Sequence, residues 1–343
     1  MQTNSRLDYI DIAKGFAITL MVFGHSYSPS GETPVMVWVY SFHMPLFFLT
    51  TGILYGLKSQ EHKTISFDLK KKCETLLLPY FLWNTLYQLF ISILAIIGGT
   101  PAKDALIHNL RMVILFNGSA MWFLPAMFIS SLVFLKTANS KSINIFIVFF
   151  TTLIGLFVPK CNEIVEVFLR SFVGLAYIAI GFYAVKFYST KYKKFYTVIL
   201  FAISLLLAFS NGIVSIASRT FQNPVLYMIN GCLGTFIIYQ VAMHIKRGIN
   251  LSRLFEYWGV NSIKILCLHG FVIQIIRLLD YKFFNNLLPS FGSVEGFIHT
   301  ALIMTILTIM MPLINKIFNW SFGVKNVSKT NPSPMANYSN NHR

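Results

Sequence analysis

The chain has 343 residues, of which 55% are hydrophobic, 16% aromatic and only 12% charged, and its mean hydropathy is +0.62. Soluble domains carry about 25% charged residues, so this chain lacks the polar surface that a water-soluble protein needs. The composition also excludes collagen-like, disordered and disulfide-stapled chains, because glycine has no period, apolar residues are abundant and there are only four cysteines. We therefore expect a polytopic membrane protein.

Apolar runs recur along the whole chain. A spanning helix needs about 20 mostly apolar residues, and ten segments approach that length. In chain order they are 10–28, 34–57, 75–98, 119–135, 142–158, 166–185, 195–210, 224–243, 262–279 and 295–316. The stretch 99–118 is amphipathic and interrupted by charges, which favours a surface or re-entrant helix, and Lys246–Gly259 is expected at the membrane interface.

The sequence thus predicts an all-α membrane protein with about ten transmembrane helices. Residues 1–320 are expected to form a single transmembrane domain. Residues 321–343 are rich in Asn, Ser and Pro, which predicts a polar, disordered tail.

The net charge of +16 is interpreted first as a topology signal. Ten spans put both termini on one side of the membrane, and 20 of the 28 Lys and Arg residues fall on that side, against 7 on the other. The positive-inside rule then places both termini in the cytoplasm. Because orientation accounts for most of the charge, no nucleic-acid partner is expected, and the lipid bilayer is the expected setting.

Ionisable residues concentrate in the first span, where they are costly and usually face a cavity or a partner. Asp11 and Lys14 are spaced i and i+3 and are expected to pair. His25 shares their helix face but lies roughly 21 Å from Asp11 along the axis, so these two cannot form a dyad. The charges can anchor the helix at the interface or serve function, and both interpretations stay open.

A second histidine, His43, lies in the second span, two residues before Pro45, which is expected to kink the helix. The short loop between the two spans makes them antiparallel neighbours, so His25 and His43 lie at similar depth. They form a proton-handling pair or are two core histidines bonded to backbone carbonyls. For His269 the ordinary interpretation is a core residue, and for Trp122 it is an anchor at the membrane interface.

Nothing in the sequence indicates a metal or a soluble-enzyme site. The four cysteines stand singly, without metal-ligand spacing, so no metal centre is expected. No GxSxG, HExxH, P-loop or GxGxxG pattern is present.

Several of these residues together resemble a known family. The pattern Arg6-x4-Asp11-x2-Lys14-Gly15-x9-His25 is similar to the first-helix signature of the integral-membrane acyltransferase-3 family. The run from Ser41 through His43 and Pro45 to Gly52 resembles the second helix of its fucose-O-acetylase-like branch. Weaker matches follow in order, at Leu76–Tyr80, Trp122–Ala126, and Gly259–Ser262 followed by His269.

The resemblance implies an enzyme that transfers acetyl from cytoplasmic acetyl-CoA, a co-substrate rather than a bound cofactor, to a sugar hydroxyl of a bacterial surface polysaccharide or its lipid-linked precursor. It implies a multi-pass protein of the bacterial cytoplasmic membrane. His25 and His43 are the implied catalytic residues. The implied donor-binding residues are Arg6, Lys14, Lys70, Lys71 and Lys72, and the supporting ones are Asp11, Trp122, Asn261, Ser262 and His269.

The chain departs from the family pattern at the donor site. Members often carry an Arg-x-x-Arg pair before the Leu-Leu-x-Pro-Tyr element, and here those two positions are Lys72 and Thr75. Lysine binds phosphate as a point charge without the bidentate fork of arginine. The expected donor cations are therefore Lys70, Lys71 and Lys72.

A second class of function also fits the composition. An exporter or flippase of a polysaccharide or lipid-linked sugar would use many spans, intramembrane histidines and a kinked second helix equally well. The sequence shows no internal repeat and no paired interrupted helices, which are common in transporters. Release of CoA together with an acylated sugar distinguishes the enzyme from the transporter.

Overall fold

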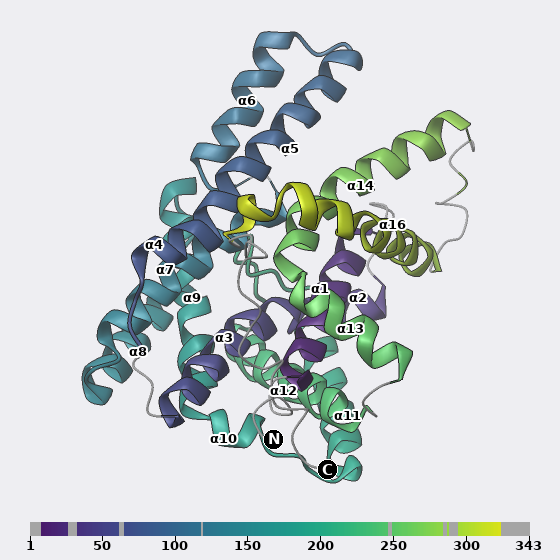
Figure 1. Cartoon of the computed structure of the whole chain (residues 1–343). Coiled ribbons are helices and arrows are strands. Elements are labelled where there is room, and N and C mark those ends of the chain that lie inside the picture. The colour runs from purple at the N-terminus through teal and green to yellow at the C-terminus, as the bar shows by residue number, and fades with distance from the viewer. Residues whose placement is uncertain are drawn as a thin grey trace, which may run out of the picture.

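The computed structural model describes residues 8–26, 33–61, 65–117, 119–245, 249–283, 287 and 294–323, and these are helical almost throughout (Figure 1). The elements are α1 (Asp8–Ser26), α2 (Pro34–Tyr40), α3 (His43–Gln60), α4 (Leu69–Lys72), η1 (Cys73–Leu77), α5 (Leu78–Ile97), α6 (Ala102–Ile114), η2 (Ala120–Trp122), α7 (Phe123–Thr137), α8 (Lys141–Phe157), α9 (Glu163–Tyr183), α10 (Val185–Tyr188), α11 (Lys194–Asn211), α12 (Pro224–His244), α13 (Asn250–Val260), α14 (Ser262–Phe283), α16 (Glu295–Ile317) and η4 (Asn319–Phe322). Within the described residues, extended pairing is limited to one bridge between Ser215 and Thr220.

Eight helical segments of the described chain are long and apolar enough to cross a membrane. They cover eight of the ten predicted spans. The other two are α1, which carries Asp8, Asp11 and Lys14, and α8, which has only 17 residues. In the described residues, all ten predicted spans are therefore helical, and eight of them are long and apolar enough to cross a membrane.

Local sequence explains where several helices begin. Thr33 caps α2 by accepting a hydrogen bond from the Met36 amide, and Asn223 caps α12 in the same way. A proline follows each cap at the first helical position, where its missing N–H costs nothing. Asn162 caps α9, so these boundaries follow from side-chain chemistry close in sequence.

The second predicted span is two helices rather than one kinked helix. The break falls at Ser41 and Phe42, between α2 and α3, and not at Pro45. Pro45 lies in the first turn of α3, where backbone N–H groups have no partner within the helix. The proline therefore starts a helix here instead of bending one, and His43 becomes the first residue of α3.

Close backbone contacts hold α1 at the centre of the fold. At its crossing with α13, a Cβ on Gly15 would overlap the Phe255 carbonyl, and one on Gly259 would overlap the Asp11 carbonyl. The segment predicted at the interface thus includes a helix packed tightly on α1. α1 also contacts α3, α12, α14 and α16.

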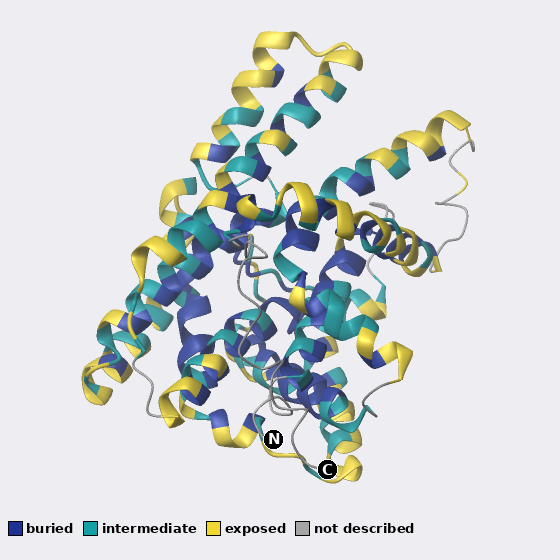
Figure 2. Cartoon of the chain, in the orientation of Figure 1, coloured by how far each residue is buried: buried dark blue, intermediate teal, exposed yellow. Residues whose placement is uncertain are grey.

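Buried residues concentrate where α1, α3, α9 and α12 meet, and exposed ones follow the tips of the α5–α6 hairpin and of α14 (Figure 2). α11 and α8 expose many large apolar side chains, among them Phe146, Phe150, Val198 and Leu206. Such surfaces suit a protein surrounded by lipid. α6, in the stretch predicted as a surface or re-entrant helix, packs beside α5 through an Asn109–Ser92 hydrogen bond of 3.0 Å.

The structure describes the first three residues of the predicted tail, 321–323. Ser321 and Phe322 are buried in η4, where Ser321 accepts a hydrogen bond from the Trp83 indole N–H at 3.1 Å and the Phe322 ring stacks on Trp83. These two residues therefore belong to the helical fold. The rest of the predicted tail, 324–343, lies outside the described residues.

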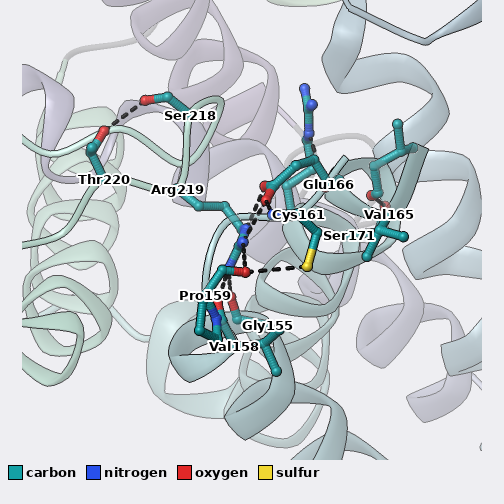
Figure 3. A network of polar contacts seen from close by, with 12 residues as sticks. Gly155, Val158, Pro159, Cys161, Val165, Glu166, Ser171, Ser218, Arg219 and Thr220 are labelled. Carbon is teal, nitrogen blue, oxygen red and sulfur yellow. Dashed lines mark hydrogen bonds and ion pairs between the residues drawn. The ribbon is translucent and has the colours of Figure 1, made fainter. Parts of the chain in front are cut away.

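An arginine holds the loop between α11 and α12 against the turn between α8 and α9 (Figure 3). Arg219 donates to both carboxylate oxygens of Glu166 at 2.6 Å and to the carbonyls of Gly155, Val158 and Pro159. The side chain of Arg219 is 3% exposed. All three nitrogen atoms of its planar guanidinium donate hydrogen bonds, so this contact joins two segments that are more than 50 residues apart in sequence.

Candidate active site

The candidate site lies where the last turn of α1 meets α14. His25 belongs to that last turn, and its ring centroid is 5.4 Å from that of His269 on α14. The sequence paired His25 with His43 and assigned His269 only a supporting place. The structure adds His269 as an immediate neighbour of His25, from a segment more than 240 residues later.

His43 lies behind this pair and is buried. It is close enough to His25 for an electrostatic interaction, and its ring packs edge-on against Tyr40. Its Nδ1 lies 2.9 Å from the carbonyl of Val39, in the last turn of α2. His43 thus makes the backbone hydrogen bond expected of a core histidine. It also lies near His25, as expected of a functional pair.

The backbone contacts determine which ring nitrogen of two histidines carries the proton. A carbonyl can only accept a hydrogen bond, so Nδ1 of His43 must be protonated. The same holds for His269, whose Nδ1 lies 2.9 Å from the Leu266 carbonyl. In the neutral rings Nε2 then carries the lone pair and is the atom that can accept a proton.

A cavity of about 290 Å³ exposes the ring of His25. We call it the histidine cavity; its lining includes His25, Tyr87, Met121, His269, Gln274 and Arg277. Arg277 is within electrostatic range of His25 and of Tyr87, and the side chains of Tyr87 and Gln274 lie close together. The cavity thus combines a base, a cation and hydrogen-bonding groups in a space large enough for a small reacting group.

Two contacts fix the backbone on either side of His25. The Tyr40 hydroxyl donates to the Gly24 carbonyl at 3.0 Å, and Nδ1 of His299 donates to the Ser26 carbonyl at 2.8 Å. The carbonyls of a helix end have no partners within the helix, so they need such donors. Sequence reasoning missed His299, Arg277 and Gln274. His299 and Arg277 are ionisable residues in apolar helices, which is itself a functional signal.

We expect His299 to act as a positioning residue. Replacing it with leucine removes the donor to the Ser26 carbonyl, so the last turn of α1 and the His25 ring lose their fixed place. Turnover is expected to fall by about tenfold, with little change in KM, because a small misplacement of a reacting group is costly.

The conservative variant separates positioning from folding. The amide of His299→Asn offers a donor near the position of Nδ1 and is expected to restore most of the turnover. Steady-state kinetics on both variants checks this, and equal losses in His299→Leu and His299→Asn contradict it.

The predicted donor-binding cations lie in different surroundings. Lys14 pairs with Asp11 at 2.6 Å, as their spacing predicted. Lys72 donates to the Tyr55 hydroxyl at 2.7 Å. Lys70 and Lys71 line a separate cavity of about 310 Å³, together with the carboxylates of Asp68 and Glu74. Arg6 lies outside the described residues.

The remaining supporting residues do not line the histidine cavity. Trp122 is buried, and the Arg170 guanidinium lies over its ring at 5.4 Å. Asn261 joins α13 to α14, and its side-chain oxygen accepts a hydrogen bond from Lys264 at 3.4 Å. Ser262 is the first residue of α14.

Two comparisons with known proteins found a similarity that covers most of the chain. A family model described as an acyltransferase domain matches residues 7–314. The nodulation protein NolL of Mesorhizobium japonicum is 23% identical over 333 residues, which cover 90% of this chain and 88% of the relative. No solved structure matches the chain.

Proposed function

The chain belongs to the acyltransferase domain family, and we propose that it is a multi-pass O-acyltransferase that transfers acetyl from acetyl-CoA to a sugar hydroxyl. The acceptor in this proposal is a surface polysaccharide or its lipid-linked precursor, and the location is the bacterial cytoplasmic membrane with both termini inside. The observation that carries the proposal is the exposed ring of His25 in a cavity beside His269 and Arg277.

The reaction in this proposal needs one base and one source of positive charge. The acceptor hydroxyl attacks the thioester carbonyl carbon while its proton passes to His25. The carbon–sulfur bond then breaks, and the thiolate of CoA leaves and takes up that proton. Arg277, within electrostatic range of His25, supplies positive charge near the oxyanion.

The neighbouring histidines are assigned to the support of His25. His269 has its Nδ1 hydrogen committed to the backbone, so its Nε2 is available to accept a hydrogen bond beside the reacting group. His43 is buried, so we assign it to the orientation of His25 or the relay of its proton rather than to contact with the sugar. Lys70 and Lys71 remain candidates for the CoA phosphates, and Asp11 holds Lys14 in place.

One assay tests the function and separates it from the transporter alternative. Purified full-length protein in lipid nanodiscs is incubated with acetyl-CoA and a panel of sugar acceptors. The expected result is free CoA thiol in a one-to-one ratio with an acetyl ester, measured by thiol titration and mass spectrometry. Movement of a sugar or lipid-linked sugar across liposomes without thiol release overturns the enzyme assignment.

A further inference from the structure

A second cavity, of about 740 Å³, opens where α13, the start of α14, the end of α16 and η4 meet. We call it the lysine cavity; its lining includes Arg253, Tyr257, Lys264, Asn315, Asn319 and Phe322. It is more than twice as large as the histidine cavity. Apart from Asn261, none of the residues that line it belongs to the site predicted from the sequence.

Lys264 carries a buried charge without a counter-charge. The residue is 9% exposed, and its Nζ donates to the side-chain oxygens of three asparagines, Asn261 at 3.4 Å, Asn319 at 2.9 Å and Asn315. All three partners are neutral. Glu256 lines the same cavity, but no described carboxylate lies within ion-pair distance of Lys264.

Burying a charge without a counter-charge costs free energy, so such an arrangement indicates that the charge serves a function. Hydrogen bonds satisfy the three donors of the ammonium, but they leave its charge uncompensated in a region of low dielectric. A carboxylate at any of the three asparagine positions would neutralise it with hardly any change of shape. The lining therefore holds two cations, Lys264 and Arg253, against one carboxylate, Glu256, and its net charge is positive.

We propose that the lysine cavity binds the phosphorylated nucleotide end of the acyl-CoA donor, with Lys264 as a phosphate-binding cation. The inference rests on the proposed function, since it takes the donor to be a CoA thioester. Small-molecule sites occupy about 300–1,000 Å³, so this cavity suits a nucleotide, whereas the histidine cavity suits only the acyl group and the acceptor atoms. The rings of Tyr257 and Phe322 offer flat surfaces for the base.

The position of the lysine cavity agrees with its assignment to the nucleotide and that of the histidine cavity to the acyl group. Lys264 precedes His269 by five residues on α14, which is about 7.5 Å along the helix axis. This separation is short compared with the pantetheine arm of CoA, so the arm is long enough to extend from one cavity to the other. Gly323, next to η4, lines the cavity of Lys70 and Lys71, so both groups of cations lie beside η4. CoA carries phosphate at two places, and the predicted lysines are available for the second.

The decisive variant is Asn315→Asp, which places a carboxylate against Lys264 and keeps the size of the side chain. The affinity for CoA and for adenosine 3′,5′-bisphosphate, measured by isothermal titration on full-length protein in nanodiscs, is expected to fall by about tenfold or more. Binding of acetyl-pantetheine, which lacks the nucleotide, is expected to stay unchanged. Asn139→Asp makes the same charge change at an exposed residue of the α7–α8 turn and is the matched control.

The outcomes separate this inference from the proposed function. If wild type binds CoA and Asn315→Asp binds it equally well, the lysine cavity is not the nucleotide site, and the enzyme assignment stands. If wild type neither binds CoA nor releases it from acetyl-CoA, the proposed function itself fails. If phosphatidylglycerol binds in place of the bisphosphate and Asn315→Asp abolishes that binding, the cavity holds a lipid phosphate and the nucleotide assignment is overturned.

Lys264→Met gives an independent reading of the same site. It removes the cation and is expected to weaken nucleotide binding as Asn315→Asp does. Asn315→Asp retains the lysine and supplies it with a counter-ion. Its melting temperature is therefore expected to stay at or above that of wild type. Loss of binding in both variants, with the fold retained in Asn315→Asp, supports a binding role.

Discussion

Replacement of His25 with alanine is expected to lower the turnover of acyl transfer by about 10²–10⁴-fold, the usual contribution of a general base. The ring is exposed to the histidine cavity and lies next to His269. Without the imidazole, the acceptor hydroxyl has no group to take its proton. The KM for acetyl-CoA should change little, because the proposed nucleotide contacts lie at Lys264. Thiol release under saturating substrate measures the effect.

A matched variant shows whether the loss belongs to the site. His108 is an exposed histidine of α6, and it does not line the histidine cavity. His108→Ala is expected to retain the activity of wild type. Unchanged turnover in His25→Ala, with a melting temperature equal to wild type, removes His25 from the mechanism.

Replacement of Arg219 with methionine is expected to lower the free energy of unfolding by about 3–5 kcal/mol, the cost of removing one partner of a buried ion pair. Glu166 would keep its charge without its main partner, and three backbone carbonyls would lose their donor. Bidentate geometry and an exposed fraction of 3% make this pair unlike an ordinary surface salt bridge. Denaturant titration of the protein in detergent, followed by tryptophan fluorescence, checks the loss.

Arg111→Met is the control for Arg219→Met. Arg111 also pairs with a glutamate in the first turn of α9, but at 3.8 Å, and the two side chains are 69% and 40% exposed. Exposed pairs contribute about 0–1 kcal/mol, so this variant is expected to unfold close to wild type. Equal destabilisation by the two variants contradicts a special role for the Arg219 contacts.

Local sequence information predicted the helices well because their determinants are local. The run predicted at 224–243 is the helix Pro224–His244, which has its cap and proline at the start, and 295–316 is Glu295–Ile317. Hydropathy over about twenty residues and a few capping side chains suffice for such assignments. The break before His43 was misplaced because the rule for proline in a helix interior was applied to a residue in the first turn.

The site itself was only partly predictable. An ionisable residue inside an apolar segment is a functional signal in any single sequence, and it identified His25 and His43. The same signal was present at His299 and Arg277, but it does not tell which other residues lie near them in the fold. Periodicity gives the face of a residue on its own helix and does not tell which helix packs against that face.

The sequence by itself determined the class of the protein, its helices, its family resemblance and the choice of His25 as a candidate residue, because composition, hydropathy and motif spacing are properties of neighbouring residues. Only the tertiary structure decided that His269 lies beside His25, that His299 supports it, and that three asparagines surround Lys264. The physical reason is that these contacts join residues up to 273 positions apart. Close helix crossings, such as that of Gly15 with α13, set the register between packed helices, and no local sequence pattern encodes that register.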